Sequence, residues 1–487
     1  MIFNALDGNT PLDFEVDVVI VGAGPAGITL SHELSKDRNV LLVEAGGKSA
    51  TPEGNDSLVG KSSGIFYPLT ETRARQFGGS TALWAGYCAL FDDIDFEARS
   101  WVEHSGWPIS VDDLSRYYPA AAKWLHLDYP EFDVNKLDLD FIKGTRIRER
   151  FCQAIWRFGI RRADFAIDHR LFFKQSNSAN LLENACVTNI GLSTDEDAVR
   201  SLTVRTSTGR QGTIRAQTVI LATGGIETPR LLLASQNKSN WGVGNEYGHV
   251  GHWFMEHPHL SIEGIALSQG SNWESWTSRA KTPAGEWYTQ NLGVLPEVQS
   301  GYKLLNARAH FYRTPLMAED APPRVGIFFE QSPNSASKIT LTDDKVDCFG
   351  MPRIRLCWEI NETDRHSHSA LCNLLAEALL DDGVALRNGL VGQSNEILHS
   401  NHQLGTTRMS QSPVDGVVDP NCKVHGLSNL YIVGGSVFPT VSWANPTLTV
   451  LALTLRLAEH LKSINAGTPQ RNKIATAKKP NPDISFR

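Results

Sequence analysis

The sequence has few of the features that mark membrane proteins, metal-cluster proteins or disulfide-rich secreted proteins. No apolar run approaches the roughly 20 residues that a membrane-spanning helix requires, and the first ten residues have neither the basic region nor the apolar core of a secretory signal. The seven cysteines are scattered without a C-x-x-C pair, which argues against a zinc ribbon, a cluster site or a disulfide framework. Their odd number is typical of a reducing compartment, so we expect a cytoplasmic protein without a membrane span.

Basic residues are also too sparse for a nucleic-acid-binding protein. The formal net charge is -7, charged residues make up 20% of the chain, and no dense basic stripe occurs outside the C-terminal tail. Internal repeats and a G-x-S-x-G nucleophile motif are absent as well. The chain of 487 residues is nevertheless long enough for two or three domains and for an enclosed cofactor.

A β-α-β unit opens the chain. Residues 16–21 form an apolar run that ends in glycines, residues 26–34 have helical spacing, and residues 39–44 supply a second strand. The turn between the first strand and the helix reads V-G-A-G-P-A-G over residues 21–27. In this fingerprint Gly22 permits the tight turn, Gly24 lets the backbone approach a pyrophosphate, Ala26 opens the helix and Gly27 allows close packing. Glu44 ends the second strand, where a carboxylate can accept hydrogen bonds from ribose hydroxyls.

Two later segments repeat the pattern of an apolar strand that breaks at glycine. Residues 218–225 precede a helical segment at 227–233, and residues 430–435 end in two glycines. Three distant pieces are therefore expected to build one nucleotide-binding sheet. Between them, alternating stretches at 324–329 and 338–342 predict antiparallel strands, and residues 366–380 predict a helix. Residues 464–487, rich in Pro, Asn, Lys and Thr, predict a disordered tail, although a basic tail could also bind an acidic surface.

Two further motifs separate FAD from other dinucleotides. The loop at residues 76–86, Q-F-G-G-S-T-A-L-W-A-G, has Gly78 and Gly79, which leave room for a flat ring or a phosphate, and Ser80, which offers a hydroxyl. Near the C-terminus stand H-Q-L-G-T-T-R-M (402–409), Y-I-V-G-G-S-V-F-P (431–439) and S-W-A-N-P-T-L-T (442–449). Together with the N-terminal fingerprint, these motifs resemble the glucose-methanol-choline (GMC) family of FAD-dependent oxidoreductases, nearest to its sugar dehydrogenase and pyranose oxidase-like branch.

The resemblance implies an α/β fold. It consists of a Rossmann-like FAD-binding domain assembled from discontinuous segments and a substrate domain with an antiparallel sheet and flanking helices. We assign residues 1–100, 185–262 and 400–463 to the FAD-binding domain and residues 101–184 and 263–399 to the substrate domain.

The resemblance also implies further FAD contacts. Val187 matches the residue whose backbone recognises the adenine, and the other matching positions carry backbone amides that approach the flavin or its phosphates. The additional cofactor residues are Ala222, Thr223, Gly224, Gly435, Ser436, Asn445, Pro446 and Thr447. Several sugar-oxidising relatives carry a histidine immediately before the loop tryptophan, and that histidine binds the flavin covalently. Here Leu83 precedes Trp84, so non-covalent FAD is expected.

Oxidation of an alcohol requires a base for the hydroxyl proton and a hydrogen-bond donor at the oxygen. His402 can serve as the base, because an unperturbed imidazole has a pKa of about 6.5. Asn445 can donate its amide to the same oxygen, and by position the pair matches the His-Asn form of the family. Asn445 can equally cap a helix that starts near Pro446. Trp443 is expected to line the substrate pocket.

Ordinary structural roles account for other histidines and aromatic residues. His257 and His259, like His366 and His368, have no acidic or thiol partner at a diagnostic spacing, so we expect no metal site. The segment at residues 255–258 instead resembles a domain-joining stretch of the sugar-active branch. Core packing is favoured for the aromatic cluster in the expected substrate domain, which comprises Trp273, Trp276, Trp287 and Tyr288.

The sequence therefore predicts FAD-dependent oxidation of a CH–OH group on a sugar, a glycoside or a similar polyol-like alcohol, with the hydride passing to flavin N5. Oxygen, a quinone or a redox protein could be the electron acceptor. An accessory subunit, including a signal-bearing partner that exports the enzyme, stays open. Two alternatives also stay open: a non-redox lyase of the same family that cleaves cyanohydrins, and a flavin-holding electron-transfer subunit.

Overall fold

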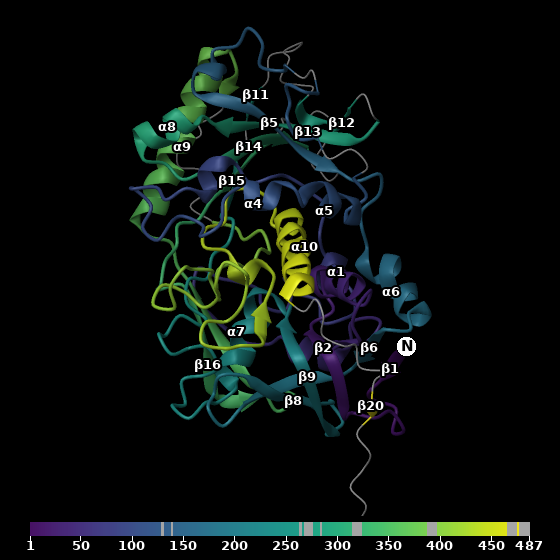
Figure 1. Ribbon diagram of the computed structural model, residues 1–487. Coiled ribbons are helices and arrows are strands. Elements are labelled where there is room, and N and C mark those ends of the chain that lie inside the picture. The colour runs from purple at the N-terminus through teal and green to yellow at the C-terminus, as the bar shows by residue number, and fades with distance from the viewer. Residues whose placement is uncertain are drawn as a thin grey trace, which may run out of the picture.

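The computed structural model describes residues 1–127, 131–137, 140–262, 265–266, 276–282, 285–313, 324–386, 397–464 and 475–476. Two groups of strands occupy opposite ends of the molecule, and helix α10 (Thr447–Ile464) lies between them (Figure 1). The Rossmann-like FAD-binding part and the antiparallel substrate part expected from the sequence are both confirmed.

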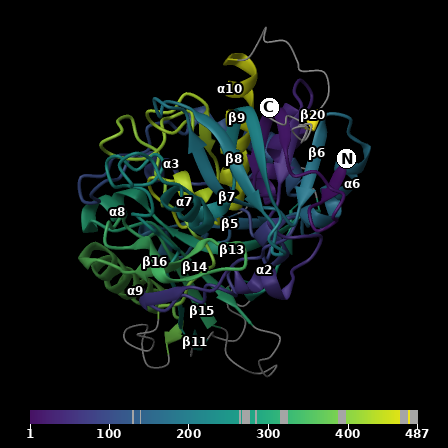
Figure 2. The same ribbon diagram turned by 90° about the horizontal axis from the view of Figure 1, so that it is seen from below.

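A nine-stranded sheet forms the first part. Its main path runs β1-β6-β3-β2-β9-β8-β7, while β19 pairs with β9 and β20 pairs with β2. The strands are β1 (Ile2–Asn4), β6 (Ala179–Glu183), β3 (Val40–Val43), β2 (Phe14–Val21), β9 (Gln211–Leu221), β8 (Val199–Arg205), β7 (Cys186–Leu192), β19 (Leu430–Ile432) and β20 (Ala475–Thr476). Pairing is parallel from β1 through β9 and between β9 and β19. Figure 2 shows the N-terminus beside β6 at one edge of this sheet.

Local sequence explains the β2-α1-β3 unit at the centre of the sheet. Strand β2 is rich in β-branched residues and almost entirely buried, as strands covered on both faces are. Helix α1 (Pro25–Leu34) starts with proline at its first position, where the missing N–H costs nothing, and its N-cap is Gly24. The one acidic side chain buried within β2, Asp17, accepts a hydrogen bond from the backbone N–H of Asn39.

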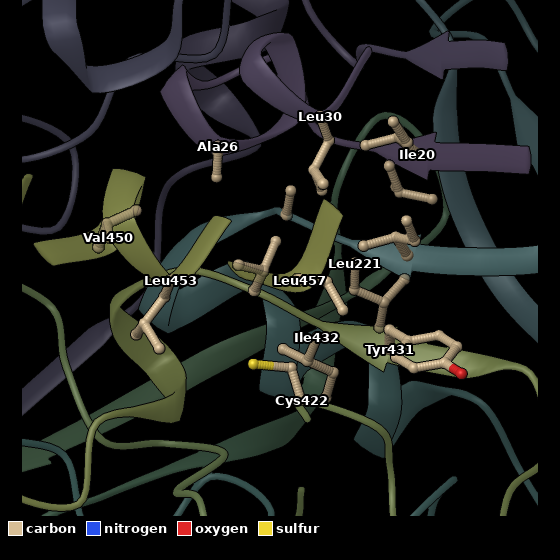
Figure 3. Packing of buried hydrophobic residues seen from close by; sticks show 14 of the residues in the cluster. Ile20, Ala26, Leu30, Leu221, Cys422, Tyr431, Ile432, Val450, Leu453 and Leu457 are labelled. Carbon is tan, nitrogen blue, oxygen red and sulfur yellow. The ribbon is translucent and has the colours of Figure 1, made fainter. Parts of the chain in front are cut away.

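Helices α1 and α10 cover one face of this sheet. Figure 3 shows Leu30 of α1 and Leu457 of α10 near Ile20 and Leu221 on the strands, with Leu453 of α10 farther from them in this view, and all five belong to one hydrophobic cluster. All five side chains are buried. Full burial of such a side chain contributes about 1.5–3 kcal/mol, so this contact holds the N-terminal and C-terminal ends of the chain together.

A six-stranded antiparallel sheet forms the second part. Its order is β10-β15-β14-β13-β12, with β5 paired to β13. The strands are β10 (His259–Ile262), β15 (Arg324–Phe329), β14 (Ala307–Tyr312), β13 (Trp287–Val294), β12 (Ala280–Lys281) and β5 (Phe151–Phe158). Helix α9 (Glu362–Asp381) covers this sheet with the buried stripe Leu371, Leu375 and Leu379. The helix predicted at 366–380 is thereby confirmed.

The chain crosses between the two parts more often than the expected domain boundaries allow. Strand β6 lies in the nine-stranded sheet, although residues 101–184 were assigned to the substrate domain. A separate sheet joins β16 (Lys338–Val346) and β17 (Pro352–Trp358) to β4 (Lys61–Gly64), which come from segments assigned to different domains. Strand pairing between distant segments follows from packing of the whole chain, and no local pattern marks the partner.

Short elements complete the described chain. The remaining helices are α2 (Pro52–Asp56), η1 (Gly79–Ala82), α3 (Asp93–Phe96), α4 (Asp112–Ser115), α5 (Tyr118–Trp124), η2 (Ile147–Glu149), α6 (Phe165–Gln175), α7 (Gly224–Ala234), α8 (Pro296–Tyr302) and η4 (Gly435–Val437), and the remaining strands are β11 (Ile265–Ala266) and β18 (Ala385–Leu386). Apart from Ile464, the last residue of α10, and β20, the predicted tail at 464–487 lies outside the described residues. None of the helices in the described ranges combines the length and the apolar character that a membrane crossing demands.

Candidate active site

A cavity of about 560 Å³ runs from the turn between β2 and α1 to His402 and Asn445. The first residues of three helices border it: Gly24 and Pro25 at α1, Thr223 and Gly224 at α7, and Thr447 at α10. Each helix N-terminus presents unpaired backbone N–H groups and a partial positive charge. The cavity therefore suits a ligand with negative groups, such as a dinucleotide with its two phosphates.

The three glycines of the N-terminal fingerprint have different surroundings. A β-carbon on Gly22 would lie 2.6 Å from the carbonyl oxygen of Ala222, and one on Gly27 would lie 2.0 Å from the carbonyl oxygen of Gly22. Glycine is therefore needed at positions 22 and 27 because any side chain would collide with the protein backbone. Gly24 borders the cavity, and a β-carbon built there would meet no protein atom within 4 Å. A side chain at Gly24 would consequently enter the space that a bound ligand uses.

Glu44 also borders the cavity, at the end of β3. Its carboxylate accepts hydrogen bonds from the backbone N–H of Ala23 at 2.9 Å and of Gly46 at 2.8 Å. Burial raises the pKa of Glu44 to about 7, although these two donors and Arg75 oppose the shift. Ala26 and Val187 contribute to the same end of the cavity, so the predicted residues of the nucleotide end lie together.

The residues of the glycine loop before η1 face different neighbours: some border the cavity, and one packs against the protein. Gly79 and Ser80 border the cavity. Gly78 turns toward α6 instead, where a β-carbon would lie 2.8 Å from the backbone nitrogen of Ala166. Gly78 thus shapes the loop rather than lining the cavity, and the direct cofactor contact expected of it is not supported.

The two later glycine segments reach the cavity from the other side. Ala222, Thr223 and Gly224 border it, as do Gly435, Pro446 and Thr447. Ser436 is fully buried beside this lining. Its backbone carbonyl accepts a hydrogen bond from Thr407, so it holds the segment around His402 and is placed behind the lining.

His402 and Asn445 meet at the opposite end of the cavity. Asn445 Nδ2 lies 3.4 Å from Nε2 of His402. The other ring nitrogen, Nδ1 of His402, lies 2.6 Å from Nδ1 of His257. Burial lowers the pKa of His402 well below its usual value, and the adjacent His257 lowers it further. His402 is therefore a neutral imidazole at physiological pH, which is the form that accepts a proton.

The backbone around His402 is held between two other segments. Leu404 exchanges both backbone hydrogen bonds with Met255, and Gly405 donates to the carbonyl of Gly435. A β-carbon on Gly225 would lie 2.1 Å from the carbonyl oxygen of Gln403, so glycine is needed for this approach. These contacts bring residues 255–257 and 402–405 side by side.

A buried carboxylate that the sequence did not reveal lies behind both histidines. Glu256 accepts hydrogen bonds from the backbone N–H groups of His257 at 2.7 Å and Ser400 at 2.9 Å, and also from that of His402. The hydroxyl of Tyr67 donates to it at 3.2 Å. Burial raises the pKa of Glu256 to about 8 in spite of these donors. The proximity of Glu256 and His257 to His402 depends on residues about 145 positions apart, so spacing along the chain carried no signal.

Trp443, which the sequence predicts to line the substrate pocket, is not among the residues that border the cavity. Its indole N–H donates to Asp92 at 2.9 Å, and the guanidinium of Arg308 lies 4.1 Å from the ring centroid. The indole N–H thus has a hydrogen-bond acceptor and the ring face has a cation inside the protein, and both contacts favour this packed position. Trp443 therefore has a structural role beside the site.

Other aromatic and imidazole side chains also border the cavity. They are Trp84, Tyr87, His259, Phe328 and His399. The rings of His259 and Phe328 stack with centroids 4.4 Å apart, and Trp84 is fixed by a 2.9 Å hydrogen bond from its indole N–H to the carbonyl of Ala163. Of the aromatic cluster considered above, Trp276 and Tyr288 are buried, Trp287 is partly exposed, and Trp273 lies outside the described residues.

The donor set fits FAD. Gly24 leaves its backbone open to the cavity, three helix N-termini border it, and Glu44 adds a carboxylate that can accept hydrogen bonds from ribose hydroxyls. Within the described part of the chain, no group of three or more His, Cys, Asp or Glu side chains is arranged to hold a metal ion.

Comparisons with known families agree with this arrangement. The family described as "GMC oxidoreductase" matches residues 333–454, and the family described as "FAD dependent oxidoreductase" matches residues 17–240. The first match contains His402 and Asn445, and the second contains the glycine fingerprint and Glu44.

Individual relatives align over most of the chain. The 2-methyl-1,2-propanediol dehydrogenase of Mycolicibacterium austroafricanum is 25% identical over 92% of this chain and 95% of its own. The paromamine 6'-oxidase of Streptomyces fradiae is 22% identical over 91% of this chain and 90% of its own. Among solved structures, pyridoxine 4-oxidase from Mesorbium loti superposes with a TM-score of 0.59 at 19% identity, covering 92% of this chain and 99% of that one.

Proposed function

Because this chain belongs to the GMC family of FAD-dependent oxidoreductases, we propose that it oxidises a CH–OH group of a sugar, a glycoside or a similar polyol-like alcohol to a carbonyl. One observation carries the proposal. His402 and Asn445 lie within 3.4 Å of each other at one end of the cavity whose other end is built for a dinucleotide.

The reaction divides between the protein and the cofactor. FAD, when bound, supplies the acceptor for the hydride that leaves the carbinol carbon. His402 takes the hydroxyl proton at Nε2, and the neutral state of its buried ring makes that nitrogen available. The amide of Asn445 donates a hydrogen bond to the substrate oxygen while negative charge develops there. The step yields the carbonyl compound and leaves the proton on Nε2 of His402.

The proposal includes non-covalent attachment of FAD. Leu83 occupies the position before Trp84 and borders the cavity, and an aliphatic side chain offers no nucleophile for a flavin bond. Denaturation in acid followed by centrifugation tests this point. Yellow supernatant is expected, whereas colour retained in the protein pellet would contradict non-covalent binding.

The aromatic lining of the cavity supports the proposed substrate class. Trp84, Tyr87 and Phe328 present aromatic faces that suit the apolar faces of sugar rings. Relatives named for 2-methyl-1,2-propanediol and for paromamine support a polyhydroxylated substrate. The net charge of -7 disfavours polyanionic substrates.

The proposal also covers the electron acceptor, an accessory subunit and the cellular location, each of which is inferred from the sequence. The acceptor is oxygen, a quinone or a redox protein. All seven cysteines are free thiols, which supports the proposed cytoplasmic location, since oxidising compartments favour disulfides.

The proposed function is tested by the visible spectrum of the purified protein without oxygen. A panel of monosaccharides, glycosides, diols and simple alcohols is added, and bleaching of the flavin band is recorded. Bleaching by polyhydroxylated compounds is expected. A flavin band that no alcohol changes would contradict the proposal and favour the cyanohydrin-lyase alternative.

A further inference from the structure

His257 lies between His402 and a backbone carbonyl. Its Nε2 is 2.8 Å from the carbonyl oxygen of Val441, and its Nδ1 is 2.6 Å from Nδ1 of His402. The ring of His257 is fully buried. Both rings therefore sit in one chain of hydrogen bonds that begins at Val441 and ends at the cavity.

The direction of this chain follows from the chemistry of its first member. A carbonyl oxygen only accepts, so Nε2 of His257 carries the hydrogen. Burial lowers the pKa of His257 to about 4, which leaves the ring neutral with a single N–H. Nδ1 of His257 is consequently an acceptor, and the hydrogen in the 2.6 Å contact belongs to Nδ1 of His402. Because His402 is neutral too, its Nε2 bears a lone pair, to which the amide of Asn445 donates.

We propose that His257 is a positioning residue that fixes the tautomer of His402, with the carbonyl of Val441 as its anchor, so that the lone pair stands on Nε2 at the cavity. The tautomer is a property of the protein alone, whereas the use of Nε2 as the base rests on the proposed function. The role matches that of a hydrogen-bonding partner that holds a catalytic imidazole in its working tautomer.

Glu256 sets the spacing of the two rings. Its carboxylate accepts the backbone N–H of His257 through one oxygen and that of His402 through the other. One buried group therefore fixes both backbones, and side-chain changes at position 257 leave this anchor in place.

Three substitutions of His257 separate the effects of its hydrogen-bond acceptor at Nδ1, its donor at Nε2 and the volume of its ring. His257→Asn places an amide oxygen near the position of Nδ1 and keeps an acceptor for His402. His257→Gln places its terminal amide near the position of Nε2 and loses that acceptor, and His257→Phe keeps a ring without either function. His368→Leu is the matched control, because it removes another buried neutral imidazole outside the cavity lining.

The first readout is the tautomer itself. Two-bond ¹⁵N–¹H spectra of ¹⁵N-histidine-labelled, FAD-bound protein distinguish protonated from bare ring nitrogens, and His402→Gln assigns the signals of His402. The wild-type protein, His257→Asn and His368→Leu are expected to show hydrogen on Nδ1 and a bare Nε2. In His257→Phe, hydrogen is expected on Nε2. Hydrogen on Nε2 of His402 in the wild type, or an unchanged tautomer in His257→Phe, would overturn the proposal.

The second readout is the anaerobic rate constant of flavin reduction, measured with the substrate that the panel identifies. His257→Phe and His257→Gln are expected to lose roughly 100-fold or more, the usual contribution of a general base, with FAD content and substrate dissociation constant unchanged. His257→Asn is expected to stay within about tenfold of the wild type. Equal losses in all three variants would overturn the positioning role. If no alcohol reduces the flavin while the tautomer is as stated, the proposed function fails and the assignment of His257 stands.

Discussion

Gly79 approaches Gly24 so closely that a β-carbon built on Gly79 would lie 2.9 Å from the α-carbon of Gly24. The loop before η1 and the first turn of α1 therefore touch through bare backbone. Gly79 also has a φ of +56°, which side chains disfavour. Gly24 differs, because its φ of -78° is ordinary and its α-carbon has open space on the cavity side.

The two glycines predict different outcomes for the same substitution. Gly24→Ala is expected to leave the thermal midpoint of FAD-free protein within about 2 °C of the wild type, while FAD affinity falls at least tenfold. Gly79→Ala is expected to lower both the midpoint and the affinity, because the protein itself is crowded there. Calorimetry of FAD-free protein and titration with FAD measure the two quantities. Normal FAD affinity in Gly24→Ala would contradict binding of the FAD phosphates at this turn.

Asn445→Ala removes the amide that is proposed to donate to the substrate oxygen. The rate constant of flavin reduction is expected to fall roughly 10²- to 10³-fold, the usual cost of losing one donor at a developing oxyanion, while FAD stays bound. Asn445→His restores an N–H donor at the same position and is expected to recover at least part of the loss. Anaerobic stopped-flow absorbance measures both variants, and a wild-type rate in Asn445→Ala would exclude the amide from the reaction.

Trp443→Phe tests whether Trp443 lines the substrate pocket, as the sequence predicts, or packs beside it. The variant loses the hydrogen bond from the indole N–H to Asp92, which is a bond to a charged group, so the free energy of unfolding is expected to fall by about 1–3 kcal/mol. The apparent KM is expected to stay within about twofold, because Trp443 lies outside the cavity lining. Urea unfolding and steady-state kinetics provide the measurements. A tenfold rise in KM at unchanged stability would show that Trp443 contacts the substrate.

His368 predicts a defined dependence of stability on pH. Burial lowers the pKa of this histidine to about 4, against about 6.5 in the unfolded chain. Between these values the unfolded chain binds a proton that the folded protein does not, so stability is present above pH 6.5 and is lost as the pH falls toward 4.

In His368→Leu this contribution disappears, and the slope of unfolding free energy against pH is expected to fall by about 1.4 kcal/mol per pH unit within that window. Urea midpoints between pH 4 and pH 7 measure the slope for both proteins. Parallel curves would show that His368 is charged in the folded state.

The nucleotide end of the site was predictable because its signals are local. The strand, the glycine turn, α1 and Glu44 all fall within residues 14–44, so a single stretch of sequence displays the whole unit. The same holds for α9, whose buried leucines recur at helical spacing. Gly78 shows the limit of this reasoning, since the motif identifies a glycine without saying which neighbour it faces.

The catalytic end was only half predictable. His402 and Asn445 stand in recognisable motifs, but His257 and Glu256 reach them through a pairing of Met255 with Leu404 that no local pattern encodes. The assignment of β6 failed for the same reason, because its partners β1 and β3 lie more than one hundred residues earlier. The contact between the indole N–H of Trp443 and Asp92 was not predictable either, because the two residues are about 350 positions apart.

The most direct test of the central claim compares wild-type protein with His402→Ala, both loaded with FAD, in anaerobic single-turnover reduction by the best substrate of the panel. The account predicts equal FAD content and a rate constant of flavin reduction at least 100-fold lower in the variant, with partial recovery at high pH, where the substrate hydroxyl loses its proton without help. A variant that binds FAD and bleaches at the wild-type rate across the pH range would contradict the assignment of His402 as the base.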